Sequence, residues 1–289
     1  MISLNLNHLK IVLLFLLIPF YANSQNTIDT TSTTTPIINE DFSFLMINAS
    51  YTNNNLEYLT GVTENIPILF TTLSYVNKSG IYVGGSYANY FNANTQTYDY
   101  SIDAGFQKNF NKGFDIDLYY SKHGFSGDTM LEGLNYDHSL NASMGVDLKK
   151  FYLSADFSYL LMPKDNNSFL NINLSRSMQV SKVFFKTDVL IINPTISATF
   201  GTDYWIYEDM TDLEKNETAL ALQSNGFSYN TFSYEGIDLF IPISYGINNT
   251  YLSFSWLYRI PADKYKLLGW ENQSGFMISI TQFLNFSKK

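Results

Sequence analysis

The chain has 289 residues, of which 17% are aromatic and only 15% are charged. Soluble domains carry about 25% charged residues, so this chain is short of the solvated surface that a soluble protein needs. The net charge of −9 argues against a nucleic-acid partner, because phosphate binding requires clustered lysine and arginine. The chain has no cysteine, which excludes disulfides, thiolate metal sites and a lipoprotein anchor.

The N-terminus predicts secretion. Lys10 precedes the apolar run Ile11–Phe20, and the small residues of Ala22-Asn23-Ser24 fit a signal-peptidase site. The run is too short to cross about 30 Å of hydrocarbon as a helix. We therefore predict a signal peptide over residues 1–24, a disordered periplasmic segment over 25–40, and a folded domain over 41–289.

The stretch Thr97–Ser121 shows the pattern on which the fold prediction depends. Two runs of alternating residues flank a turn, Asn109–Gly113, whose Asn-Lys-Gly is typical of a tight hairpin. One face of the hairpin is aromatic and aliphatic, with Tyr98, Tyr100, Ile102, Ala104 and Phe106 in the first run. The other face carries four aspartates. Successive side chains of a strand point to opposite faces, and long strands of this kind are typical of membrane barrels.

The remaining chain predicts an all-β, antiparallel up-and-down transmembrane barrel of about twelve strands. We expect strands near 41–52, 67–77, 80–91, 97–109, 113–122, 135–148, 150–162, 168–180, 194–206, 228–247, 250–260 and 274–286. Short turns alternate with long loops if Ser177–Asn193 is one periplasmic connection, as in outer-membrane barrels. Ten or fourteen strands stay open, because Lys182–Ile192 has the composition of a further strand.

Two irregularities are predicted in the long strand 228–247. The alternation changes phase around Glu235-Gly236, which indicates a β-bulge. Pro242 removes a ladder donor inside the same strand and indicates a second bulge. The preceding loop, 207–227, contains a helical pattern over Asp209–Gln223 with a capping box at Thr211 and Glu214. Leu213, Leu220 and Leu222 are expected to pack this helix on the barrel, either inside the lumen or over the rim.

The last strand alternates apolar residues and closes on an aromatic, with Phe276, Ile278, Ile280, Leu284 and Phe286 on its outward face. With the signal peptide and the amphipathic strands, this pattern resembles the porin-like outer-membrane β-barrels of Gram-negative bacteria over roughly Asp41–Phe286. The resemblance implies location in the outer membrane, contact with its lipid, and recognition of the last strand by the barrel-assembly machinery. It departs in one way, because three residues follow the terminal aromatic.

Acidic residues dominate the inward register. We predict that the lumen is lined by Asp99, Asp103, Asp115, Asp117, Asp137, Asp156, Asp203, Asp238 and the cation Arg259. A ladder of carboxylates in a narrow aqueous lumen favours cations. The alternative is a plugged interior in which these groups pair with loop cations.

No catalytic, metal-binding or cofactor-binding site is predicted. In outer-membrane phospholipase A, a barrel of similar strand number, the catalytic His, Ser and Asn lie on the lipid-facing side. His138 falls in the outward register, but Ser139 and Asn141 do not, so we interpret His138 as an interfacial polar residue. His123 is expected in a solvated loop. Trp205, Trp256 and Trp270 are interpreted as interfacial anchors.

The sequence therefore predicts a porin or narrow channel for small polar or cationic solutes. Two alternatives stay open: a structural or adhesive barrel with partner-binding loops, and a lipid-modifying enzyme of the outer membrane. A secreted β-sandwich is the alternative at the level of the fold.

Overall fold

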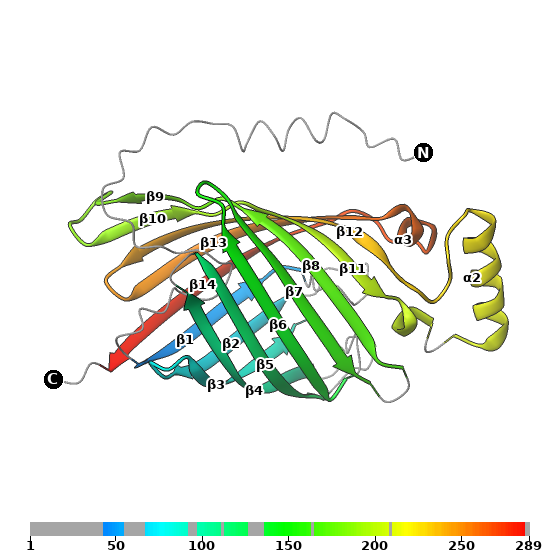
Figure 1. The fold of residues 1–289 in the computed structure, drawn as a ribbon, viewed down its shortest axis with the longest axis horizontal. Coiled ribbons are helices and arrows are strands. Elements are labelled where there is room, and N and C mark those ends of the chain that lie inside the picture. Colours follow the sequence, from blue (N-terminus) through cyan, green and yellow to red (C-terminus); the bar gives the residue numbers. More distant parts are fainter. Residues whose placement is uncertain are drawn as a thin grey trace.

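The computed structural model describes residues 43–54, 67–91, 97–110, 113–126, 136–162, 165–207 and 210–286. The predicted signal peptide and N-terminal segment, residues 1–24 and 25–40, lie outside these residues, as does the side chain of Trp205. Within the described part, the dominant feature is one antiparallel sheet that closes on itself (Figure 1).

Twelve strands form the closed wall. They are β1 (Ser43–Thr52), β2 (Ile68–Val76), β3 (Ile81–Tyr90), β4 (Thr97–Phe110), β5 (Phe114–Ser126), β6 (His138–Asp147), β7 (Tyr152–Leu161), β8 (Asn167–Ser175), β11 (Thr195–Thr202), β12 (Phe232–Ile247), β13 (Thr250–Pro261) and β14 (Gln273–Phe286). The seam is the pairing of β1 with β14, which runs from Ser43 opposite Phe286 to Thr52 opposite Met277. The prediction of a twelve-stranded antiparallel barrel is confirmed.

The two faces of the wall differ as the alternation predicts. On the outer face Ile102 is 60% exposed, Leu118 50% and Ile280 50%. In water these side chains would form a large exposed apolar surface, which soluble monomers rarely have. Trp256 lies on this face and stacks on Tyr258 with ring centroids 5.7 Å apart. A closed antiparallel barrel with an apolar, aromatic-rich outer face is the architecture of outer-membrane β-barrels.

Tight turns join the strands at one end of the barrel. Gly80 and Gly113 adopt positive φ values of 90° and 68°, and Lys149 and Asn248 adopt 71° and 54°. Two-residue hairpin turns need such left-handed positions, and glycine adopts them without steric cost. The four predicted short turns therefore lie together at this end, which the loop-length pattern of the sequence predicts to face the periplasm.

The long strand β12 carries one of the two predicted bulges. Thr199 pairs with Gly236 and Phe200 with Tyr234, so Glu235 is the extra residue and the predicted bulge is confirmed. The second prediction is wrong, because Pro242 pairs in register with Ser255 of β13. On its other side β12 changes partner instead, from β11 to β10 (Asp188–Ile192).

A small hairpin fills the connection that we predicted as one periplasmic turn. β9 (Met178–Ser181) pairs with β10, and β10 pairs with Ile243–Ile247 of β12. The hairpin continues beyond the ends of β8 and β11, alongside the end of β12, and β9 forms the free end of the described sheet (Figure 1). Its tip exposes Phe184 and Phe185 between Lys182 and Lys186.

Short helices gather at the opposite end. They are η2 (Tyr204–Tyr207), α2 (Asp212–Ser224) and α3 (Asp263–Leu267). The capping box of α2 is confirmed, with Thr211 and Glu214 bonding reciprocally. Leu222 is buried, but Leu213 and Leu220 are exposed, so the expected three-leucine packing face is wrong. Figure 1 shows α2 beyond the strand ends, outside the lumen. None of the described helices is long and apolar enough to span a membrane.

Candidate functional site

The inner face of the wall encloses a cavity of about 460 Å³. Asp99 of β4 and Asp156 of β7 line it, together with Asp238 of β12 and Arg259 of β13. Uncharged side chains complete the lining, among them Ser50, Thr52, Ile68, Phe70, Ala88, Tyr90, Asn171, Asn173 and Ser197. A concave site of this size, with apolar walls and a few convergent polar groups, is typical of small-molecule sites.

Five carboxylates share the inner face of β4, β5 and β7, and we call them the carboxylate stripe: Asp99, Asp103, Asp115, Asp117 and Asp156. Asp99 lies two residues inside the long-loop end of β4, whereas Asp115 lies one residue inside the tight-turn end of β5. The stripe therefore descends most of the length of the wall. Within the described part of the chain, none of the five forms an ion pair.

Hydroxyl groups, and not cations, satisfy the upper members of the stripe. Tyr90 donates to Asp99 at 3.2 Å. Asp103 accepts from Ser121 at 2.5 Å and from Ser101 at 3.1 Å. Such bonds orient the carboxylates and leave their formal charge uncompensated.

The lower members repeat one arrangement twice. Tyr82 of β3 reaches across β4 and donates to Asp117 of β5 at 2.9 Å. The strand between them has Gly105 at the crossing point, where an added Cβ would lie 2.6 Å from the Tyr82 ring. The phenol can lie flat against the wall only because this position has no side chain.

Tyr152 of β7 makes the second crossing. It passes over Gly145 of β6 and donates to Asp115 of β5, with oxygen distances of 2.7 and 2.8 Å. A Cβ at Gly145 would lie 1.7 Å from the Tyr152 hydroxyl. Both glycines therefore keep a large ring on the wall and out of the bore.

Asp156 has two polar neighbours on the same wall. Ser143 donates to it at 2.5 Å, and the side-chain amide of Asn173 also donates to it. Across the cavity, Asp238 is paired with Arg259, whose Nε lies 2.7 Å from Oδ1. Asp238 and Arg259 thus line the cavity as a compensated pair, unlike the members of the stripe.

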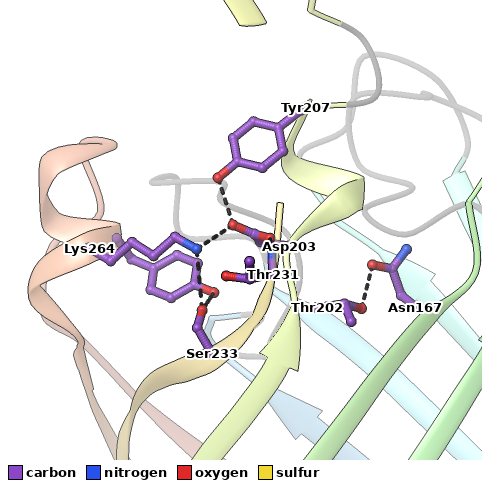
Figure 2. A network of polar contacts seen from close by, with 8 residues as sticks. Asn167, Thr202, Asp203, Tyr207, Thr231, Ser233 and Lys264 are labelled. Atoms are coloured by element: carbon purple, nitrogen blue, oxygen red, sulfur yellow. Dashed lines mark hydrogen bonds and ion pairs between the residues drawn. The ribbon is translucent and has the colours of Figure 1, made fainter. Parts of the chain in front are cut away.

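Asp203 lies elsewhere than the lumen-lining prediction placed it. It follows the end of β11, is completely buried, and forms an ion pair with Lys264 of α3 at 2.6 Å (Figure 2). It also accepts from Tyr207 at 2.7 Å and from the backbone N–H of Thr231 at 2.8 Å. Burial, reinforced by the hydrogen bond to Asp203, raises the pKa of Tyr207, so this phenol stays a neutral donor. The network fixes the loops at the rim and leaves this carboxylate out of the bore.

The same loop cluster contains a carboxylate that the sequence pattern predicted only as a bulge position. Glu235, the bulge residue, is 5% exposed, and its Oε1 has no hydrogen-bond partner in the described residues. Lys264, which also donates to Ser233 at 3.3 Å, was likewise not predicted as a partner. The phase change of the alternation marks Glu235 in the sequence, whereas Lys264 has no such signal.

Asp137 and the histidines complete the predicted positions. Asp137 precedes β6 and is exposed at the loop end, because β6 begins only at His138. His123 is not a loop residue as predicted. β5 continues to Ser126 and places the His123 imidazole on the inner face, with Nε2 3.3 Å from the Ser139 hydroxyl. Ser139 is 3% exposed, so this pair is a shielded polar contact.

His138 lies on the outer face. Its Nδ1 is 2.6 Å from the Tyr120 hydroxyl, and the two rings stack with centroids 5.7 Å apart. A tyrosine partner of this kind suits the interfacial position that we predicted. No group of three His, Cys, Asp or Glu residues that could hold a metal ion occurs within the described ranges.

Comparison with known proteins gives structural likenesses only. No protein-family model matches the sequence, and no curated protein matches it. The barrel is similar to the KdgM porin (10% identity, TM-score 0.47, covering 82% of this chain and 98% of that one). It is also similar to LpxR from Salmonella typhimurium (7% identity, TM-score 0.48, covering 83% and 100%). A third similar structure is an outer membrane channel from Pseudomonas putida F1 (8% identity, TM-score 0.45, covering 90% and 100%). At these identities and TM-scores, none of the likenesses bears on what this chain binds or transports.

Proposed function

We propose that this chain is an outer-membrane channel whose bore passes small cations. The observation that carries the proposal is the carboxylate stripe, which descends the inner wall without an ion-pair partner in the described residues. Carboxylates that line a narrow aqueous path create a negative potential, which raises the local concentration of cations and excludes anions.

The balance of charge on the inner face supports this choice. Arg259 is the one basic residue in the inward register of the twelve described wall strands, and Asp238 neutralises it. The remaining inward charges of the wall are acidic. The field in the bore is therefore set by the stripe, and it acts most strongly on ions that pass close to β4, β5 and β7.

The flat tyrosines supply a second argument for an open path. Tyr82 and Tyr152 would block a narrow bore if their rings pointed toward the axis. Instead, Gly105 and Gly145 allow both rings to lie along the wall with their hydroxyls on the carboxylates.

The outer membrane is the compartment that fits this fold. A closed barrel satisfies all of its backbone polar groups within the wall, which a lipid-exposed structure requires. The predicted signal peptide would deliver the chain across the inner membrane, where the barrel-assembly machinery receives proteins of this type.

The competing proposal is a closed barrel whose loops bind a partner. An aromatic group on the inner face near the periplasmic rim favours it. Phe283 lies edge-on to both Phe44 and Tyr251, each with centroids 5.8 Å apart. If these rings close the bore, the protein has no conductance, and the exposed helix α2 is the surface proposed to bind the partner.

A planar-bilayer measurement separates the two proposals. Purified protein under a KCl gradient should give a reversal potential of the cation-selective sign. Replacing Asp99, Asp103, Asp115 and Asp117 by asparagine together should reduce that potential, and raising the salt should weaken it, because the field is screened.

The matched control removes four acidic charges away from the bore. Asp165, Asp212, Glu217 and Asp263 are exposed at the loop end, and their neutralisation should leave the potential close to that of the parent protein. Anion selectivity would overturn the cation channel. Absence of any conductance in correctly folded protein would favour the closed barrel instead.

A further inference from the structure

The cavity in the bore has two chemically different walls. Ile68 and Ala88 are buried side by side with Tyr90, and Phe70 packs against them. All four also line the cavity. Because Tyr90 bonds to Asp99 through its hydroxyl at 3.2 Å, the apolar wall meets the carboxylate stripe directly.

The facing wall carries side-chain amides. In the closed ring of twelve strands, β8 lies six strands from β2 and is therefore diametrically opposite to it. Asn171 and Asn173 of β8 line the cavity there, and Asn173 donates to Asp156. A molecule in the cavity thus meets Asp99 beside apolar side chains on one side and amides with Asp156 on the other, while Phe240 and Leu257 line the arc of β12 and β13.

Inorganic cations make poor use of such a site. A hydrated K⁺ ion gains from the carboxylates, but it gains nothing from aliphatic and aromatic side chains, which cannot replace its water ligands. An organic ammonium with an apolar body gains from both, because the body leaves water against Phe70 and the charged end stays beside Asp99.

Arg259 adds no net charge to this cavity. Its guanidinium lines the cavity and is paired with Asp238 at 2.7 Å. The net negative charge of the lining is therefore that of Asp99 and Asp156, which favours a positively charged molecule.

We propose that the cavity is a binding site for amphiphilic organic ammonium ions, with the ammonium group toward Asp99 and the apolar body against Phe70. This inference rests on the proposed cation channel and names the solute class that the channel would prefer.

The test uses block of the K⁺ current by four probes. Benzylammonium carries both features, methylammonium lacks the apolar body, benzyl alcohol lacks the charge and benzoate reverses it. We expect half-block by benzylammonium at a concentration at least about tenfold lower than by any of the other three, as an aromatic contact and a charge contact act together.

Two variants locate the effect. Phe70→Ala should raise the half-blocking concentration of benzylammonium about fivefold or more, since the principal ring of the apolar wall is removed. Leu73→Ala lies on the outer face of the same strand, where Leu73 is 53% exposed, and should change nothing in block. Folding of each variant is checked by heat-modifiable gel mobility.

The outcomes separate the two proposals. If K⁺ selectivity is present but benzylammonium blocks no better than methylammonium, the organic-ammonium site is refuted and the cation channel stands. If no current is found, the channel is refuted, and binding is measured by saturation-transfer NMR in nanodiscs of deuterated lipid. Transfer to benzylammonium that is equal in the parent protein and in Phe70→Ala would then overturn the binding site as well.

Discussion

Gly145→Ala tests whether the tyrosine crossings shape the bore. A methyl group at Gly145 would lie 1.7 Å from the Tyr152 hydroxyl and 2.2 Å from Cζ, whereas real Cβ contacts stay above 3.0 Å. The ring must therefore leave the wall, and the direction open to it is the lumen. In doing so it loses the hydrogen bonds of 2.7 and 2.8 Å to Asp115.

The expected change in the free energy of unfolding is opposite in sign to the usual effect of a glycine-to-alanine substitution in a strand. Alanine in place of a strand glycine normally stabilises by roughly 0.5–1 kcal/mol. Here the loss of a hydrogen bond to a charged group removes about 1.5–3 kcal/mol, so the free energy of unfolding should fall by about 0.5–2.5 kcal/mol. Single-channel conductance should also fall, because the displaced phenol narrows the path beside Asp115.

Urea-induced unfolding in lipid vesicles measures the first effect, and planar-bilayer recording measures the second. The control is Gly145→Ala in a Tyr152→Ala background, where the clash is absent and the substitution should no longer destabilise. If Gly145→Ala raises stability in the parent protein and leaves the conductance unchanged, the proposed role of the glycine is wrong.

Three further predictions follow from the wall, the rim network and the helix cap. In urea titrations of the barrel in lipid vesicles, Ile102→Arg should lower the free energy of unfolding by about 2–4 kcal/mol, whereas Asp103→Asn, on the inner face, should be tolerated. Equal effects of the two substitutions would refute the assignment of the faces. Lys264→Met leaves the Asp203 carboxylate buried and unpaired, so thermal unfolding should reveal a loss of about 3–5 kcal/mol, which a second change, Asp203→Asn, should partly restore. The hydrogen bonds from Thr211 lower the pKa of Glu214 below its usual 4.5. The Glu214 carboxylate therefore stabilises the start of α2 fully above pH 4.5, and this stabilisation is lost as the pH falls through the lowered pKa. Hydrogen exchange at the first turn of α2 should accelerate in acid, and it should do so less in Glu214→Gln.

The period-two pattern was sufficient to predict the wall. Thr97–Ser121 forms β4 and the first part of β5 with Ile102 outside and Asp103 inside, because a slip of one residue would turn every apolar side chain inward. The bulge at Glu235 was predictable for the same reason, since an extra residue shifts the phase of the alternation.

Contacts between segments that are distant in the chain were not predictable from a local pattern. Pro242 marked an irregularity, but the identity of the strand beside it depends on β10, which is distant in the chain. The burial of Asp203 depends on Lys264, which belongs to another loop and has no signal in the alternation. His123 was predicted to lie in a loop, yet the pairing of β5 with β4 continues past it to Ser126.

The seam between β1 and β14 has a consequence for the order in which the barrel forms. Most neighbouring strands are joined by a short turn or a single loop, so their pairing closes a small loop of chain. The seam pairs ten residues of β1, the first strand in the chain, with ten residues of β14, the last strand, so nearly the whole domain lies between them in sequence. Its closure carries the largest entropic cost and should come last. Until then both edges present rows of unpaired backbone groups, which is the state most exposed to wrong pairing with a second chain.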